Sequence, residues 1–433
     1  MMPFSFFQEC SHKSSSTTNN SFTFKGGCPP IRPTIRYCKV EVLRSPRLTF
    51  EPISSMPALV NPNPPPELLS WTEHPVTTEP LDWAPLAIID LAKFDQPGGK
   101  QELANELKDA VKLWGFWTVI NTGISQEQLD RQLDIGYTFF KQPLAEKKKV
   151  VCNFSEGNYF GYREPYRLIG KSGVKENMEM LNLPKYTSHY ESFPRHDLIE
   201  AYKDEIQPFH RLVWDNVIRK LFILFAIILE LPEEYFVEKH HYDKPSEDHL
   251  RYMIYHPRPA EEDAKTGGQW SPGHTGFGAM TLLFSQSVAA LQIRTPNNEW
   301  KWVKHVPGGI TCNAADTLSF LTKGYIKSTV HRVVRPPADQ ANLERLGLFY
   351  FVRPGDDIPM VPVPSPVLIR EGLLSEEEAR LGEEQASEAV KGFEYVRARV
   401  KNVHNRNARH VQDGKGTHEV FRVKNLEVQD FYA

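Results

Sequence analysis

The sequence predicts a mainly β fold with flanking helices, and three observations support this prediction. From Leu250 onward the chain reads as short β-type runs separated by turn residues, a spacing typical of an all-β sandwich or barrel. Two earlier stretches, Gln101 to Trp114 and Pro208 to Glu230, carry apolar residues at helical spacing. No internal repeat occurs, so a solenoid or propeller is not expected. With 433 residues, the chain can bury a sizeable core.

The elements before the β-rich part follow from local patterns. Leu86 to Asp90 is a short apolar run that predicts a strand, and the helix over Gln101 to Trp114 comes next. Trp114 to Ile124 then predicts a strand followed by a glycine turn. Pro208 suits the first turn of the second helix. The apolar run Leu221 to Leu229 is about half of the roughly 20 residues that cross a bilayer, so we expect part of a buried helix.

The β-rich part contains seven runs that we expect to be strands. These runs are Arg251 to His256, Ala279 to Phe284, Ala290 to Arg294, Trp300 to Val303, Thr317 to Leu321, Val330 to Val334 and Leu346 to Val352. Beyond Pro362 the sequence is charged, and Ser375 followed by three glutamates is the pattern of an N-capped helix. We expect this tail to pack on the β-rich core as a cover.

These patterns divide the chain into five parts: 1–80, a disordered or targeting segment and linker; 81–200, an N-terminal region; 201–245, scaffold helices; 246–356, the β-rich core; and 357–433, a helical cover. The stretch before Met56 is rich in Ser, Thr and Asn and more basic than acidic, as mitochondrial transit peptides are. Prolines interrupt it and no clean amphipathic period is present. We therefore expect disorder or an over-long gene model there, with mitochondrial targeting as the alternative.

Charge and cysteine content exclude several classes of protein. The 51 Lys+Arg against 54 Asp+Glu give a net charge of -3, without the excess of basic residues that binds nucleic acid or anionic membranes. The five cysteines form no CxxC pair, which argues against a disulfide framework and a zinc site. A cytoplasmic protein fits this composition best.

The most informative motif is His274-Thr275-Gly276, followed later by His331. The chain has 15 histidines, and a single histidine is usually a surface or core residue, so their context matters. The segments around them, SPGHTGFGAMTLLF (271–284) and KSTVHRVVRP (327–336), strongly resemble the catalytic core of the isopenicillin-N-synthase-like 2-oxoglutarate/Fe(II) dioxygenases. Residues 114–124 and 139–147 resemble the N-terminal region of that family more weakly.

This resemblance implies a double-stranded β-helix, or jelly-roll, core in which His274 and His331, 331 minus 274 or 57 positions apart, bind one Fe(II). It also implies that Arg345 binds the distal carboxylate of the co-substrate 2-oxoglutarate and that Tyr255 donates to the same molecule. Many members read Arg-x-Ser at this point, whereas this chain has Gly347 in place of the serine. The implied reaction is hydroxylation or desaturation of a small organic metabolite with O2.

Gly276 departs from the family at the metal itself, because the resembled motif is His-x-Asp. Three outcomes follow. Water or another carboxylate fills the gap and oxygenation survives; or chloride occupies it, as in the Fe(II)/2-oxoglutarate halogenases; or the protein is a catalytically inactive binding protein of the same fold. Asp316 is close in sequence, but Asn313 to Asp316 resembles the family's structural Asn-x-Gly-Asp turn. We therefore do not assign Asp316 to the metal.

Overall fold

The computed structural model describes residues 65–165, 167–170, 172–405, 409–413, 416–424 and 426–431. The expected disordered or targeting segment before residue 65 lies outside these residues. From residue 65 the chain runs along the helix α2 (Gln126–Phe140), where the backbone N–H groups of Leu69 and Trp71 donate to Thr138 and Asp134. Among the described residues, no helix is both long and apolar enough to cross a bilayer.

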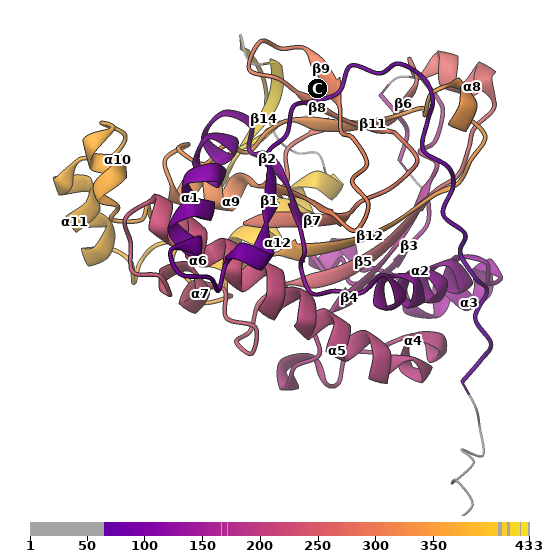
Figure 1. Ribbon diagram of the computed structural model, residues 1–433, viewed down its shortest axis with the longest axis horizontal. Helices are drawn as coiled ribbons and strands as arrows, with labels where there is room; N and C mark the ends of the chain where they lie inside the picture. The colour runs from indigo at the N-terminus through magenta and orange to yellow at the C-terminus, as the bar shows by residue number, and fades with distance from the viewer. Residues whose placement is uncertain are drawn as a thin grey trace, which may run out of the picture. The chain divides into compact units, whose positions relative to one another are not determined.

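Two sheets form the core, as predicted, and face each other as a jelly roll (Figure 1). The larger sheet has the order β1 (Ile88–Asp90), β2 (Phe116–Ile120), β10 (Ile310–Ala314), β7 (Met280–Phe284), β12 (Arg345–Val352), β5 (His249–Tyr255), β4 (Met178–Pro184) and β3 (Gly161–Arg163). The smaller sheet has the order β6 (Gln269–His274), β11 (His331–Val334), β8 (Leu291–Arg294) and β9 (Trp300–Trp302). Neighbouring strands are antiparallel except β1 and β2.

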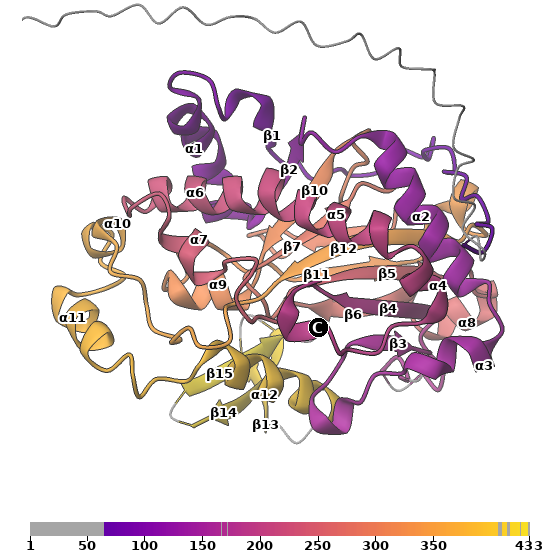
Figure 2. The same cartoon turned by 90° about the horizontal axis from the view of Figure 1, so that it is seen from below.

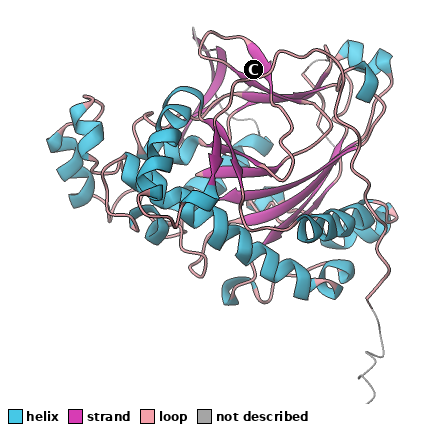
Figure 3. Cartoon of the chain, viewed as in Figure 1, coloured by secondary structure: helices cyan, strands magenta, loops and turns pink. Residues whose placement is uncertain are grey.

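Helices flank the strands on the outside (Figure 3). Besides α2, the α-helices are α1 (Gly99–Asp109), α3 (Leu144–Lys147), α4 (Asp197–Ala201), α5 (Lys203–Val213), α6 (Arg219–Ile228), α7 (Tyr235–Lys239), α8 (Ala260–Lys265), α9 (Asp316–Leu321), α10 (Pro366–Arg370), α11 (Glu376–Glu384) and α12 (Gly392–Asn405). Two π-helical turns, η2 (Ala110–Trp114) and η6 (Trp214–Ile218), extend α1 and join α5 to α6. Short 3-10 turns are η1 (Leu91–Lys93), η3 (Lys148–Val150), η4 (Phe154–Glu156), η5 (Ser188–Tyr190) and η7 (Ala338–Gln340).

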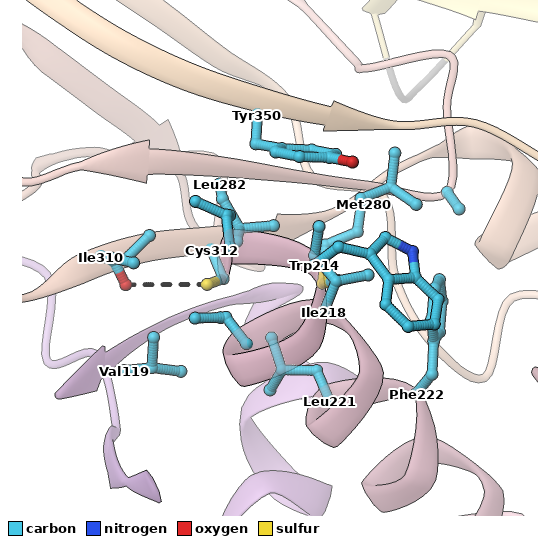
Figure 4. Packing of buried hydrophobic residues seen from close by; sticks show 14 of the residues in the cluster. Val119, Trp214, Ile218, Leu221, Phe222, Met280, Leu282, Ile310, Cys312 and Tyr350 are labelled. Atoms are coloured by element: carbon cyan, nitrogen blue, oxygen red, sulfur yellow. Dashed lines mark hydrogen bonds between the residues drawn. The ribbon is translucent and has the colours of Figure 1, made fainter. Parts of the chain in front are cut away.

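The main hydrophobic core lies between the larger sheet and the helices α2, α5 and α6, which run along one side of it (Figure 2). Figure 4 shows Trp214, Leu221 and Phe222 packed against Met280 and Leu282 of the sheet. All of these side chains are buried, and burial of each large apolar side chain contributes about 1.5–3 kcal/mol. The apolar run that we predicted to be a buried helix is α6.

Three expectations from the sequence were wrong in detail. Thr317 to Leu321 is not a strand but belongs to α9, because its fully buried leucines, Leu318 and Leu321, are three residues apart and share one face of a helix. Pro208 lies inside α5, which begins five residues earlier at Lys203. The tail is not only helical, since β13 (Arg409–Asp413), β14 (Gly416–Val423) and β15 (Leu426–Phe431) form a third sheet. The N-cap at Ser375 is confirmed as a capping box.

Candidate metal and co-substrate site

His274 and His331 lie directly opposite each other on the paired strands β6 and β11. Their ring centroids are 4.5 Å apart. Each Nδ1 is within hydrogen-bonding distance of a carbonyl two residues earlier, Pro272 O at 2.9 Å for His274 and Thr329 O at 3.0 Å for His331. A carbonyl only accepts, so each Nδ1 carries the proton and each Nε2 keeps its lone pair. Both imidazoles are thus held in the tautomer that binds a metal through Nε2.

Burial also keeps both histidines in the neutral form that binds metals. It lowers the pKa of His274 below its usual value, and it lowers the pKa of His331, with a smaller contribution from His274, to about 3. Neutral rings need not lose a proton when a cation arrives at neutral pH. Phe116 packs edge-on against His331, with ring centroids 5.4 Å apart, which fixes the ring plane further.

The structure explains how Gly276 fits beside the histidines. A Cβ placed on Gly276 would lie 3.1 Å from the Ala315 Cβ, a tight contact that a side chain at 276 could make only if Ala315 moved by a few tenths of an ångström. Ala315 stands where the resembled Asn-x-Gly-Asp turn has glycine. The Asp316 carboxylate accepts a hydrogen bond from Thr275 Oγ1 at 3.0 Å and pairs with Arg399 at 2.8 Å. Asp316 is therefore engaged by Thr275 and Arg399.

Arg345 and Tyr255 face each other across β12 and β5. Arg345 is 3 % exposed, and its Nε donates to the Val288 carbonyl at 3.2 Å. Burial lowers the pKa of Arg345 to about 10, which still leaves the group charged at neutral pH. Among the described residues no carboxylate pairs with it, and it lines the same cavity as the two histidines. A buried, unpaired guanidinium in a cavity is suited to bind a carboxylate from outside the chain.

Gln286 lies beside Gly347, the position at which the resembled Arg-x-Ser motif has serine. A Cβ on Gly347 would lie 2.6 Å from Gln286 Nε2, so the end of the Gln286 side chain would have to move to admit a side chain at 347. Gln286 Nε2 donates to the Leu346 carbonyl at 2.6 Å, and its Oε1 is buried without a partner among the described residues. No local pattern in the sequence indicates the contact between Gln286 and Gly347, because the two residues are far apart in the chain.

One cavity of about 460 Å³ between the two sheets contains all four predicted residues. Four further arginines line it that we did not single out from the sequence, Arg163, Arg167, Arg251 and Arg353. The sequence contained a signal for Arg251, because Arg251 and Tyr255 are an even number of residues apart along β5, and side chains at even spacing share one face of a strand.

The side chains present fit a divalent transition metal with two imidazole donors. No group of three His, Cys, Asp or Glu side chains in the described part of the chain is placed to hold a metal ion. A metal bound here would therefore have two protein ligands, and its other positions would be open to the co-substrate and water.

A jelly roll with paired histidines and a buried arginine in one cavity is similar to the sites of the non-haem metal oxygenases, which add a carboxylate to two histidines. Residues 86–201 match the family model described as "non-haem dioxygenase in morphine synthesis N-terminal", and residues 247–354 match the "2OG-Fe(II) oxygenase superfamily". The UPF0676 protein C1494.01 of Schizosaccharomyces pombe is 32% identical over 288 residues, which cover 64% of this chain and 84% of that protein. The chain belongs to the 2OG-Fe(II) oxygenase superfamily, oxidoreductases that use Fe(II) and 2-oxoglutarate.

Other relatives and solved structures agree with this assignment. The 1-aminocyclopropane-1-carboxylate oxidase of Dictyostelium discoideum is 27% identical over 311 residues, covering 63% of this chain and 83% of that protein. A full-length Neurospora crassa protein in complex with alpha-KG and thymine superposes with a TM-score of 0.62 at 23% identity, over 73% of this chain and 97% of that one. A putative 2OG-Fe(II) oxygenase family protein from Caulobacter crescentus gives a TM-score of 0.61 at 19% identity, over 74% and 99%. These structural matches confirm the jelly-roll fold.

Proposed function

We propose that the protein is a 2-oxoglutarate- and Fe(II)-dependent oxygenase that hydroxylates or desaturates a small organic metabolite. The observation that carries this proposal is the pairing of His274 with His331, each with a free Nε2, in the cavity that also holds the unpaired Arg345. The names of the relatives support a small substrate, since they include 1-aminocyclopropane-1-carboxylate oxidase and azadirone synthase.

In this proposal each side chain has one task. His274 and His331 bind Fe(II) through Nε2, and the backbone carbonyls behind them hold the rings in place. Arg345 binds the distal carboxylate of 2-oxoglutarate, and Tyr255 contacts the same molecule. Fe(II), when bound, supplies the oxidation of a C–H bond by O2 coupled to decarboxylation of 2-oxoglutarate. The aromatic lining, which includes Phe116 and Phe277, excludes water from the cavity.

The first test is an anaerobic titration of the protein with Fe(II) and 2-oxoglutarate, following the visible charge-transfer band of the chelate with and without chloride. We expect a band that does not depend on chloride, and succinate formation once O2 is admitted with a substrate. A band that requires chloride would replace this proposal with the halogenase, and no band at all would replace it with the inactive binding protein.

Two variants show whether the band comes from the proposed residues. His331→Gln should abolish it, because one of the two protein ligands is lost. Arg345→Gln should leave Fe(II) binding intact but raise the concentration of 2-oxoglutarate needed for half-maximal band intensity at least tenfold. If Arg345→Gln titrates like the unsubstituted protein, the co-substrate lies elsewhere.

A further inference from the structure

Of the arginines that line the cavity besides Arg345, Arg251 and Arg353 lie on or next to the central strands β5 and β12, and the proposed function gives them no task. Arg353 follows β12 and is 2 % exposed, and Arg251 lies on β5. Both line the cavity that contains His274 and His331. In the described part of the chain no carboxylate forms an ion pair with either of them. Arg353 is buried and Arg251 is partly buried, and buried arginines are normally paired, because an unpaired buried charge loses its hydration without compensation.

The surroundings hold each guanidinium in place through its Nε and through aromatic rings. Arg353 Nε donates to the Tyr159 hydroxyl at 3.3 Å, and the guanidinium lies 4.0 Å from the centroid of the Phe277 ring. Gly278 makes room for it, since a Cβ there would be 2.2 Å from Arg353 Nη1. Arg251 Nε donates to Asn182 Oδ1 at 2.6 Å. No hydrogen bond of the terminal Nη groups of Arg251 and Arg353 is found among the described residues, so they remain available to a ligand.

The two guanidinium groups lie beside the same aromatic ring. The Arg251 guanidinium is 4.2 Å and the Arg353 guanidinium 5.4 Å from the centroid of Phe351. Their charges act on each other: burial, followed by the charges of Arg353 and Arg163, lowers the pKa of Arg251 to about 9. Arg163 is itself neutralised by Glu176 at 2.5 Å. An anion placed between Arg251 and Arg353 would relieve this repulsion.

This pair is too far from Arg345 to share the co-substrate with it. Arg345 is opposite Tyr255, whereas Arg251 is opposite Phe349, four residues further along β12. Four residues of a strand span roughly 13 Å. The Arg251 guanidinium also leans onto Phe351, still further from Arg345. A five-carbon diacid held by Arg345 and the metal does not reach this distance, so the pair serves a different anion.

We propose that Arg251 and Arg353 form a second anion subsite, which binds a carboxylate on the organic substrate while Arg345 holds 2-oxoglutarate. Two guanidinium groups offer the parallel N–H donors that a carboxylate accepts. Phe277, Phe351 and Tyr159 surround the pair, so the remainder of the substrate next to the carboxylate is apolar or aromatic. The inference rests on the proposed function only in calling this ligand the substrate.

The test measures binding of acids and of their primary amides, which match in carbon skeleton and lack the charge. The protein is saturated with Mn(II) and 2-oxoglutarate, so that Arg345 is occupied, and acetate, hexanoate and 3-phenylpropanoate are titrated calorimetrically beside the three amides. We expect 3-phenylpropanoate to bind at least tenfold more tightly than its amide. Arg251→Gln and Arg353→Gln should each remove most of this preference, and Arg251→Lys, which keeps the charge, should retain part of it.

Controls separate the subsite from general effects. Arg131→Gln, at an exposed ion pair with Glu205, should leave the preference for acids over amides unchanged. The affinity for 2-oxoglutarate should be unchanged in Arg251→Gln and Arg251→Lys, which also shows that these variants are folded. Equal binding of acids and amides, or an acid preference that survives in Arg251→Gln, would overturn the proposal. Tighter binding of phenyl phosphate than of 3-phenylpropanoate would overturn the assignment to a carboxylate.

The design also separates this proposal from the proposed function. If the unsubstituted protein binds neither Mn(II) nor 2-oxoglutarate, the oxygenase function fails. The comparison of acids with amides can still be made on the metal-free protein, where a preference for the acids that depends on Arg251 would support the subsite alone.

Discussion

Gly276 and Ala315 pack closely at the point where the resembled family has a carboxylate ligand. Their Cβ positions would be 3.1 Å apart, closer than side chains normally approach, so an aspartate at 276 needs more room than Ala315 leaves. We predict that Gly276→Asp with Ala315→Gly binds Fe(II) at least tenfold more tightly than the unsubstituted protein, which is about 1.4 kcal/mol. Gly276→Asp alone should gain less. Anaerobic Fe(II) titration measures both.

The control for this pair is Gly276→Ala, which adds the Cβ without the carboxylate and should not tighten Fe(II) binding. If the double variant binds Fe(II) no better than Gly276→Ala does, position 276 does not face the metal.

Short local motifs predicted four residues of the candidate site. His274, His331, Arg345 and Tyr255 were all predicted, and they line one cavity. Residues that act through contacts between distant segments were not found. Ala315 matters only because it lies against Gly276, and Gln286 only because it fills the space beside Gly347. Such contacts depend on strand pairing and register, which a single sequence does not reveal.

At the scale of elements, α12 is joined to α9 and to the metal motif by one buried ion pair. Arg399 of α12 is 1 % exposed, and it pairs with Asp316 of α9, which also accepts from Thr275 Oγ1. Removing one partner of a buried pair leaves the other charge uncompensated. We predict that Arg399→Leu lowers the free energy of unfolding by about 3–5 kcal/mol, measured by urea denaturation.

The matched control is Arg380→Leu on α11, whose pair with Glu384 is exposed. It should change the free energy of unfolding by about 0.5 kcal/mol or less. Equal effects of Arg399→Leu and Arg380→Leu would show that α12 is not held by this pair.

A second link between elements depends on pH. His256, just after β5, lies between Glu179 of β4 at 2.9 Å and Glu344, next to β12, at 3.0 Å, and Lys147 and Lys141 neutralise the same carboxylates. Burial opposes its charge, but the two carboxylates raise the pKa of His256 to about 9. Its stabilising contribution is complete below pH 6.5 and is lost as the pH rises through about 9.

The carboxylates of Glu179 and Glu344 set the lower end of the pH range in which these ion pairs stabilise the protein. Against the effect of burial, His256, Lys147 and Tyr162 lower the pKa of Glu179 to about 2, and His256 and Lys141 lower that of Glu344 to about 2. Their contribution is present above about pH 4.5 and is lost toward pH 2. We predict that His256→Gln destabilises the protein most between pH 4.5 and 6.5 and little above pH 9, measured by thermal unfolding in a pH series. A loss independent of pH would contradict this account.

The sequence predicted the type of an element correctly where apolar residues alternate or cluster, and it failed where they do neither. The strands at β5, β7, β8, β11 and β12 were predicted, because apolar residues alternate or cluster there. β10, with the sequence Ile-Thr-Cys-Asn-Ala, was missed since it mixes polar with small residues, although all five are buried. The prediction of a strand at α9 was wrong because five residues are too few to separate the two periods.

For the molecule as a whole, successive side chains of a strand point to opposite faces of the sheet. Residues that stabilise the core therefore lie on one face and residues that line the cavity on the other. On β7, Met280 and Leu282 face the helices, whereas Thr281 and Leu283 line the cavity. We predict that Phe222→Ala, on the helical side, lowers the free energy of unfolding by about 3–5 kcal/mol and leaves the Fe(II) and 2-oxoglutarate affinities unchanged. Calorimetry and the band titration measure the two quantities. A weakened band in folded Phe222→Ala would show that the core and the cavity are coupled.

The pairing of the two histidines also affects folding. Each ring is oriented by a carbonyl of its own segment, so each half of the site forms locally, and only the pairing of β6 with β11 brings the halves together. A metal bound by both histidines would act as a cross-link that closes a loop of 57 residues. Closing a loop of that length by a covalent cross-link is worth about 4 kcal/mol in chain entropy. A reversible cross-link gives part of this only while metal is present, so the stability of the folded protein would rise with the supply of iron.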